Sequence, residues 1–284
     1  LGYEVDIFEA KEKPSGLTVY GIAPYKITNE EVLKEVAYLQ NQLGFNIKYK
    51  TAINSKEALK SLEDEYDAIF IGVGLGKTRN LELEGEEKEN VIGAVEFVEE
   101  LRMKHYKLAV PKKVVVLGGG NTAMDAASEA ARMGAKKTVL AYRNSKEKMG
   151  AYGFEYDLAI SAGVDSLFNV TPIAITGNGK VEGVKFAKTE MVHGKLKTNM
   201  NNTFIVRCDM VIKATGQAKQ GHLYDLIDDL EIDIKTRIKT NHEFQTSNPK
   251  YFAGGDAING GAEVVNAAYD GKMAAQGIHN WLKK

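Results

Sequence analysis

The chain has 284 residues, 44% of them apolar and 26% charged, which is ordinary for a globular protein of about two domains. Its 37 basic and 38 acidic residues give a net charge of -1, and the lack of a basic excess argues against a nucleic-acid partner. The single cysteine, Cys208, excludes an intrachain disulfide and a cysteine-ligated iron–sulfur cluster and favours a cytoplasmic protein, and no apolar run is long enough to predict a membrane partner.

The part of the chain before Pro111 alternates between strand and helix patterns. It predicts strands near residues 5–8, 45–53 and 66–76, and helices over residues 29–43, 55–62 and 91–105. The helix over 29–43 has Asn29 as an N-cap candidate and Gly44 as its stop. The strand near 66–76 is almost continuously apolar, which indicates burial on both faces, as in a parallel sheet.

The alternation continues after Pro111, with a meander of strands in its middle. The patterns predict strands near residues 112–117, 137–143, 209–216 and 250–254, further strands between 168 and 207, and helices over 121–133, 155–163 and 262–281. The turns "GNGK" and "VHGK" each predict a hairpin. Strands that alternate with helices are typical of an α/β fold with a parallel sheet.

A repeat of long period relates the two parts of the chain. "ARMGAKKTVLAYR" in the middle matches the opening "LGYEVDIFEA", and "MVIKATG" matches "IFIGVGLG". We therefore expect two copies of one nucleotide-binding unit. In the second copy a strand, a glycine loop and a helix, residues 114–132, precede the match, and the first copy has no counterpart of them. We expect the chain to begin part-way into its first copy.

The glycine loop of the second copy carries the main chemical motif. Gly118, Gly120 and Ala123 fit G-x-G-x-x-G/A between a strand and a helix. The first glycine permits a tight turn, the second lets a pyrophosphate approach the backbone, and the small third residue lets helix and strand pack closely. The phosphate then meets the positive end of the helix. The alternative is a glycine-rich structural turn.

Charged residues follow the next strand in each copy. Arg143 stands where an NAD site carries an acid, with Lys146 and Lys148 behind it, and a basic group there favours the 2′-phosphate of NADP. The alternative is a solvated loop, with NAD as the nucleotide. In the first copy Glu9 occupies the same strand end and suits a ribose diol, although an exposed loop carboxylate is the alternative.

A third signal lies in "YFAGGDAINGGAEVVNAAYDGKMAA". An apolar strand delivers Asp256, whose carboxylate suits the hydroxyls of a cofactor, and the helix that follows can stabilise negative charge at its N-terminus. A glycine turn capped by an aspartate is the alternative. The five histidines have no metal-ligand spacing, and the sequence has neither a G-x-S-x-G motif nor a convincingly spaced pair of catalytic carboxylates, so no metal site or catalytic side chain is predicted. The chemistry then belongs to cofactors.

Five stretches together resemble one family. They are "FEAKEKPSGLTVYGIAPYKI", "VVVLGGGNTAMDAA", "AYRNSKEKMGAY", "VIKATG" and "YFAGGDAINGGAEVVNAAYDGK". The family comprises the glutamate synthase small chain, the flavin- and pyridine-nucleotide-binding part of dihydropyrimidine dehydrogenase, and related oxidoreductases. The resemblance spans nearly the whole chain, and "FEYDLAISAGV" and "NGGAEVVNAA" favour its dihydropyrimidine dehydrogenase branch.

The resemblance implies two Rossmann-like domains. An NAD(P)-binding domain, residues 108–217, would be inserted in a split FAD-binding domain, residues 1–107 and 218–284, whose first strand and glycine loop are missing from this chain. The implied cofactor-binding residues are Glu9, Gly16, Leu17, Gly74, Asp256 and Val264 for FAD, and Gly118, Gly120, Asn121, Thr122, Arg143 and Gly216 in the NAD(P) domain. Ser15 and Gly150 stand where the family commonly has glycine and proline.

The resemblance also implies a reaction. Hydride would pass from NAD(P)H to FAD, and electrons would leave through iron–sulfur clusters on a partner subunit or domain, because this chain lacks the cysteines to hold them. Two other hypotheses remain at this point. One is a non-catalytic nucleotide-binding fragment that binds NAD(P)H but not flavin. The other is a disulfide reductase of the same architecture, which the lack of a CxxC pair disfavours.

Overall fold

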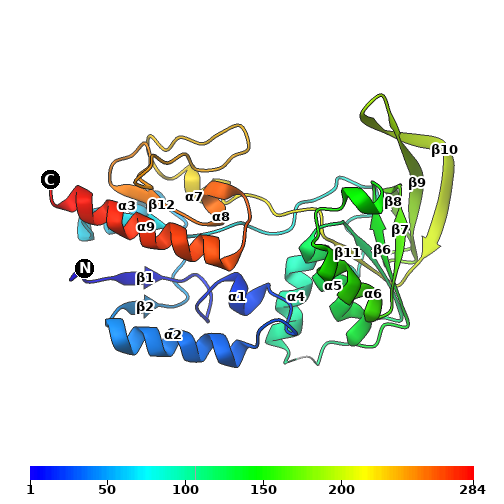
Figure 1. Ribbon diagram of the computed structural model, residues 1–284, viewed down its shortest axis with the longest axis horizontal. Helices are drawn as coiled ribbons and strands as arrows, with labels where there is room; N and C mark the ends of the chain where they lie inside the picture. The colour runs from blue at the N-terminus through cyan, green and yellow to red at the C-terminus, as the bar shows by residue number, and fades with distance from the viewer. Residues whose placement is uncertain (106) are drawn as a thin grey trace. The chain divides into compact units, whose positions relative to one another are not determined.

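A computed structural model describes residues 1–105 and 107–284 (Figure 1). The chain forms two compact units. Unit 1 comprises residues 1–18, 30–76 and 217–284, and unit 2 comprises residues 19–29 and 77–216. Each unit is therefore assembled from segments that are far apart in the sequence.

Unit 2 is built on a sheet of five parallel strands in the order β4-β11-β5-β6-β7. Its strands are β4 (Val91–Gly93), β5 (Lys113–Leu117), β6 (Lys137–Tyr142), β7 (Val164–Phe168) and β11 (Met210–Lys213). Its longer helices are α4 (Ala94–Met103), α5 (Asn121–Arg132) and α6 (Gly153–Ser161), and a short η1 (Lys146–Lys148) follows β6. The strand order places β5, which leads into the glycine loop, in the centre of the sheet.

The two faces of this sheet carry different partners. Along β5, Val114 and Val116 point into a core shared with helices α4, α5 and α6. Val115 and Leu117 point to the other face, into a core that includes Ile175 and other residues of an antiparallel sheet. Successive side chains of a strand point to opposite faces, so the apolar run "VVVL" reflects burial on both sides.

The antiparallel sheet of unit 2 has the order β10-β9-β8. Its strands are β8 (Val170–Thr176), β9 (Gly183–Val192) and β10 (Lys195–Arg207). The turns between them fall at "GNGK" and "VHGK", so the two predicted hairpins are confirmed. This sheet covers the face of the parallel sheet that the helices leave free.

The bounds of the compact units differ from the predicted domain bounds of 1–107 with 218–284 and 108–217. Residues 77–107 lie in unit 2 because β4 pairs with β11, Ile92 lying opposite Ile212. The first three residues of the predicted helix over 91–105 are therefore a strand. Residues 19–29 also lie in unit 2, where Tyr25 and Lys26 bond to side chains of α5 and α6. The assignment of FAD and NAD(P) to the two units stays a prediction.

Unit 1 contains two separate parallel pairs of strands, β1 with β2 and β3 with β12. The strands are β1 (Asp6–Phe8), β2 (Asn46–Lys48), β3 (Ile69–Ile71) and β12 (Tyr251–Ala253). The helices α2 (Asn29–Leu43), α3 (Lys56–Glu65) and α9 (Val264–Leu282) accompany them, with the short helices α1 (Leu17–Tyr20), α7 (Gly221–Tyr224) and α8 (Asp256–Asn259). Within the described residues no helix is both long and apolar enough to cross a membrane.

Among the described residues of unit 1, β1 and β3 each have one edge with no strand paired to it. Val5 and Glu9 direct their backbone bonds toward β2, so the backbone of Phe8 faces the opposite edge. Ile69 and Ile71 direct theirs toward the β12 side, so the backbone of Phe70 faces away from it. In unit 2 the corresponding pairs, β6-β7 and β4-β11, are joined by β5.

Two glycines of α9 differ sharply in their surroundings. A Cβ built on Gly277 would lie 2.1 Å from the carbonyl oxygen of Glu243, whereas one on Gly271 would meet no described atom within 4 Å. We expect Gly277→Ala to lower the free energy of unfolding by about 1–2 kcal/mol through overpacking. Gly271→Ala should raise it by up to about 1 kcal/mol through helix propensity. Urea unfolding of both variants checks this, and equal effects would contradict the close packing at Gly277.

Asp6 links β1 to its neighbours and makes unit 1 sensitive to acid. Its carboxylate bonds to Lys48 at 2.8 Å and accepts from the Tyr66 hydroxyl and the Asn46 amide. The bonds from Lys48 and Tyr66 lower the pKa of Asp6 to about 2. A lowered folded pKa adds stability that is present above the unfolded pKa of about 4 and is lost as the pH falls toward 2.

We therefore expect Asp6→Asn to flatten the loss of thermal stability between about pH 4 and pH 2. Melting temperatures measured from pH 5 to pH 2 check this expectation. Asp67→Asn, at an exposed position of the same unit, is the matched control and should keep the wild-type slope. If the melting temperature of Asp6→Asn fell with pH as steeply as that of the wild type, Asp6 would not be the source of the acid sensitivity.

Candidate functional site

The glycine loop of unit 2 begins with a residue that only glycine fits. Gly118 has φ +154°, and its N–H donates to the carbonyl of Ala141 at 3.0 Å. A Cβ on Gly118 would lie 2.4 Å from the carbonyl oxygen of Ala214, at the end of β11. Ala123 is fully buried in the core between α5 and the sheet. These two positions fix the close approach of helix, loop and strands.

The next two glycines meet different surroundings. A Cβ on Gly119 would lie 2.5 Å from the ring of Tyr142, so this glycine lets the ring pack on the loop. A Cβ on Gly120 would meet no described atom within 4 Å. Gly120 is the N-cap of α5 and provides no side-chain cap. The open space beside Gly120 therefore adjoins the free N–H groups of the helix, which suits an anionic ligand.

Asn121 and Thr122 form the first turn of α5, and the nucleotide contacts that the resemblance implies for them stay a prediction. That turn contains no acidic residue, so its positive end is not neutralised locally. The Asn121 Oδ1 atom accepts a hydrogen bond from the backbone N–H of Tyr152 at 2.9 Å. Asn121 thus ties the start of α5 to the start of α6.

Arg143 follows β6 directly, and its side chain is exposed. The loop after it folds back onto the glycine loop, because the Tyr142 hydroxyl donates to the carbonyl of Lys148 at 2.7 Å and the Ala151 N–H donates to the carbonyl of Gly119 at 3.0 Å. The Lys146 ammonium lies 4.5 Å from the centre of the Tyr156 ring. Arg143 is therefore free of burial at the end of β6, and its contact with a 2′-phosphate stays a prediction.

A buried charge cluster beside this loop was missed by the sequence analysis. The Lys26 ammonium lies 2.8 Å from Asp125 on α5 and 2.7 Å from Glu155 on α6, and the Tyr25 hydroxyl donates to Asp125 at 2.7 Å. Burial raises the pKa of Asp125, and the bonds from Lys26 and Tyr25 oppose this. Asp125 shares its face of α5 with the buried polar residues Ser128 and Glu129, so no apolar stripe in the sequence singled it out as the partner of Lys26.

In unit 1, Glu9 follows β1 as predicted. Its backbone N–H donates to Lys48, its carbonyl accepts from Thr51, and its side chain accepts from the N–H of Lys11 at 2.8 Å. The carboxylate therefore lies at the carboxyl end of a parallel strand, where ligands bind in α/β folds. Its contact with a ribose stays a prediction.

The predicted residues Gly16 and Leu17 belong to the tight turn that starts α1. Ser15 has φ +74° and Gly16 φ +48°, both in the left-handed region that favours glycine. The Thr18 N–H and hydroxyl both donate to the carbonyl of Ser15. This conformation gives a physical reason for the glycine that the family commonly has at position 15.

The loops that follow Gly74 and Asp256 approach each other at Leu75 and Gly261. Gly76, two residues after Gly74, donates its N–H to Ala218, and a Cβ on Gly261 would lie 3.8 Å from the Leu75 side chain. Asp256 follows β12, and its Oδ1 atom accepts from the N–H of Ala262 at 3.0 Å, so it caps the turn that leads into α9. The capping alternative for Asp256 is therefore present, and its contact with a cofactor stays a prediction.

Two further predicted residues, Val264 and Gly216, lie at the ends of other elements. Val264 is the first residue of α9 and is 52% exposed. Gly216 follows β11, has φ +96°, and accepts the N–H of Arg79 at 3.0 Å within unit 2. The sequence analysis missed Gln217 and Gln220, whose side chains donate to the carbonyls of Gly76 and Leu75.

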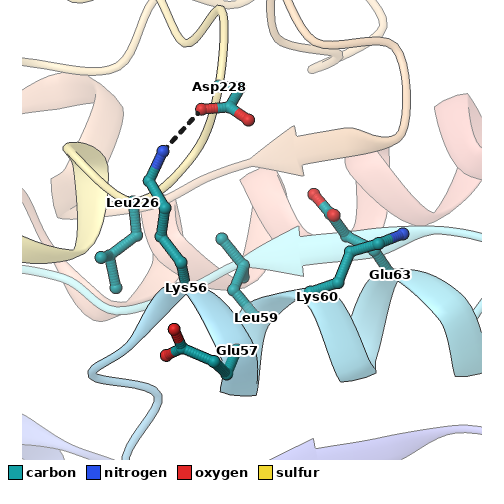
Figure 2. Close-up of a pocket in the computed structure, with 7 residues that line it drawn as sticks. All are labelled: Lys56, Glu57, Leu59, Lys60, Glu63, Leu226 and Asp228. Carbon is teal, nitrogen blue, oxygen red and sulfur yellow. Dashed lines mark hydrogen bonds and ion pairs between the residues drawn. The ribbon is translucent and has the colours of Figure 1, made fainter.

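The pocket in Figure 2 lies along α3 and contains none of the predicted cofactor residues. The Lys56 ammonium bonds to Asp228 at 3.0 Å across it. Both side chains are largely exposed, and such surface pairs contribute little. The residues predicted to bind nucleotides therefore lie outside this pocket.

Comparisons with known proteins place the chain among its relatives. A model of the family described as pyridine nucleotide-disulphide oxidoreductase matches residues 4–271. The glutamate synthase [NADPH] small chain of Escherichia coli (strain K12) is 35% identical over 99% of this chain and 64% of its own length. The NAD-dependent dihydropyrimidine dehydrogenase subunit PreT homolog of Salmonella typhi is 29% identical over 100% of this chain and 64% of its own length. The chain thus spans less than two thirds of both relatives.

A solved structure supports the fold. The thioredoxin reductase of T. acidophilum superposes with a TM-score of 0.76 over 100% of this chain and 92% of that chain, at 19% identity. This likeness agrees with an α/β fold of two dinucleotide-binding domains.

Proposed function

The chain belongs to the pyridine nucleotide-disulphide oxidoreductase family, and we propose that it is the electron-input part of an FAD- and NAD(P)H-dependent oxidoreductase. The observation that carries the proposal is the loop Gly118–Gly120 at the start of α5. Its first two glycines are required by protein packing, whereas the third borders open space at the helix N-terminus. This is the arrangement that a dinucleotide pyrophosphate needs.

The nicotinamide nucleotide is held by unit 2. Gly120, Asn121 and Thr122 surround its pyrophosphate, and Arg143 at the end of β6 supplies a cation for the 2′-phosphate of NADP. The relative from Escherichia coli carries NADPH in its name, which agrees with a basic residue at this strand end. The relative from Salmonella typhi is named as NAD-dependent.

FAD is held by unit 1. Glu9 at the end of β1 binds the ribose, while the turns at Gly16–Leu17 and Gly74, with Asp256 and Val264, line the rest of the cofactor. Unit 1 fits FAD only in part, because β1 and β3 present open edges where unit 2 has β5 and its glycine loop. We propose that a further parallel strand with a glycine loop, from polypeptide outside these residues, lies between β1 and β3 and completes the FAD site.

When both nucleotides are bound, the nicotinamide supplies a hydride and the flavin accepts it and can release electrons singly. The residues of this chain bind and orient the cofactors, and none of them is proposed to transfer a proton. The proposed acceptor of the electrons is an iron–sulfur partner subunit or domain, since a chain with one cysteine cannot hold such a cluster. The relatives are named as a small chain and a subunit, which supports a partner. The sequence motifs favoured the dihydropyrimidine dehydrogenase branch, whereas the identities of 35% and 29% favour the glutamate synthase branch, which we propose instead.

Disulfide chemistry is not part of the proposal. Cys208 is the single cysteine and is 1% exposed. Burial raises the pKa of its thiol to about 12, so the reactive thiolate is scarce at neutral pH. A redox dithiol needs a second cysteine that this chain does not have.

Visible absorption spectra test the proposal. The purified chain, and a longer chain with the preceding segment of its own gene, are measured before and after addition of FAD and then NADPH. We expect the longer chain to bind flavin that NADPH bleaches. Flavin binding by neither chain, with NADPH still bound, would favour the alternative of a non-catalytic nucleotide-binding fragment. A chain that binds neither nucleotide would refute the proposal.

Arg143 decides between the two nicotinamide nucleotides. We expect Arg143→Glu to weaken NADPH binding by roughly 10- to 30-fold, because the charge-assisted bond to the 2′-phosphate is replaced by repulsion. NADH binding should change by less than about threefold. Isothermal titration with both nucleotides checks this, with Lys148→Glu as a control for general charge. Equal losses for NADPH and NADH would contradict the NADP assignment.

A further inference from the structure

Two aromatic side chains stand exposed beside the glycine loop of unit 2. Tyr152 is 49% exposed and Phe154 is 63% exposed. Their rings are stacked, with centroids 5.6 Å apart and an angle of 8° between the planes. Such a pair presents flat apolar surface to solvent, which is unfavourable unless something covers it.

The pair is held in place by the nucleotide loop itself. The backbone N–H of Tyr152 donates to Asn121 at the start of α5, and the N–H of Ala151 donates to the carbonyl of Gly119. Phe154 is fixed by the first turn of α6, where Glu155 is anchored by its ion pair with Lys26. The rings are therefore attached to the same backbone that borders the open space at Gly120.

We propose that Tyr152 and Phe154 form a stacking platform for the adenine ring of the nicotinamide nucleotide. The inference rests on the proposed function and names a residue pair for one half of that ligand. The adenosine half of a dinucleotide lies at the end of the second strand of such a unit, which here is β6 with Arg143. The loop from Arg143 closes back onto Gly119 one residue before Tyr152, so the pair belongs to the adenosine side.

Stacking of a base on an aromatic side chain is favourable for every base, because each has a π-face, and it contributes a modest amount to affinity. The platform would thus add affinity without hydrogen bonds to the base. It would also cover the two exposed rings when the nucleotide is bound. Arg143 would complement the aromatic platform, because its guanidinium would bind the 2′-phosphate while the platform binds the adenine ring.

Binding of ligand fragments by the whole chain tests the platform. The ligands are NADPH, adenosine 2′,5′-bisphosphate for the adenosine half, and reduced nicotinamide mononucleotide for the other half, each measured by calorimetry. The double variant Tyr152→Ala/Phe154→Ala should bind NADPH and the bisphosphate about tenfold more weakly and leave the mononucleotide unchanged. Tyr152→Phe keeps the ring and should bind as the wild type does.

Tyr38→Ala on α2 of unit 1 is the matched control, since Tyr38 is 63% exposed, and it should bind all three ligands normally. Unchanged affinity of the double variant for the bisphosphate would overturn the inference, as would a loss confined to the mononucleotide, which would place the nicotinamide on the rings. Failure of the wild type to bind NADPH would overturn the proposed function as well. Circular dichroism melting confirms that the variants are folded.

Discussion

Gly120→Ala is expected to weaken NADPH binding by about 10- to 100-fold while leaving the protein as stable as the wild type. A methyl group at this position would meet no described protein atom within 4 Å, and the backbone of Gly120 lies outside the left-handed region. Folding therefore tolerates alanine. The methyl would instead occupy the space through which a pyrophosphate approaches the helix N-terminus, and overpacking of this kind costs roughly 1–3 kcal/mol.

Calorimetric titration with NADPH and a thermal melt of the same sample separate the two effects. Gly118→Ala is the contrasting variant, because its Cβ would overlap the carbonyl of Ala214, and it should lower the melting temperature. Gly150→Ala, a nearby glycine whose Cβ also meets no described atom within 4 Å, should change neither quantity. Wild-type NADPH affinity in Gly120→Ala would remove the main support for the nucleotide site.

Lys26→Met is expected to lower the free energy of unfolding of unit 2 by about 2–3 kcal/mol. The ammonium of Lys26 is the cation that bonds to both Asp125 and Glu155, and the two carboxylates are nearly buried. Removal of one partner from a buried ion pair leaves an uncompensated charge, which costs roughly 3–5 kcal/mol. We expect less because the Lys26 side chain is 26% exposed.

The pH dependence of this variant distinguishes lost charge from lost packing. Burial already raises the pKa of Asp125, and the loss of Lys26 raises it further. A raised folded pKa favours folding below the ordinary pKa of the carboxyl, and this stability is lost as the pH rises through the folded value. The deficit of Lys26→Met should therefore be smaller at pH 4 than at pH 7.

Urea unfolding at the two pH values measures this deficit. Lys34→Met is the matched control, because Lys34 pairs with Glu30 on the surface of α2 with both side chains about three-quarters exposed. It should leave the stability close to that of the wild type at either pH, because exposed pairs contribute little. A deficit in Lys26→Met that is equal at pH 4 and pH 7 would show that the lysine acts through packing alone.

Much of the fold could be predicted because local signals agree with the tertiary structure. The predicted helix over 29–43 matches α2, Asn29–Leu43. The apolar run "VVVL" matches the central strand β5, buried on both faces. The strand β4, Val91–Gly93, was predicted as helix, since its three residues are too short to show a period of two before α4 begins.

The candidate site could be predicted only where a motif fixes the backbone. The glycine spacing identified Gly118 and Gly120, because turns and close approaches restrict the residue type. The contact of Lys26 with Asp125 joins residues that are distant in the chain, and sequence spacing carries no information about it. Likewise, no periodicity predicts that the rings of Tyr152 and Phe154 stack outside the core.

The place of residues 19–29 has a consequence for how the two units behave as modules. The segment comes from between two parts of unit 1 yet supplies Tyr25 and Lys26 to the helices of unit 2. A fragment of residues 77–216 would therefore carry Asp125 and Glu155 with no lysine to pair them. Neither unit can be transplanted into another protein as one continuous stretch of gene. Recombination between relatives must keep residues 19–29 together with the helices α5 and α6 to which they bond.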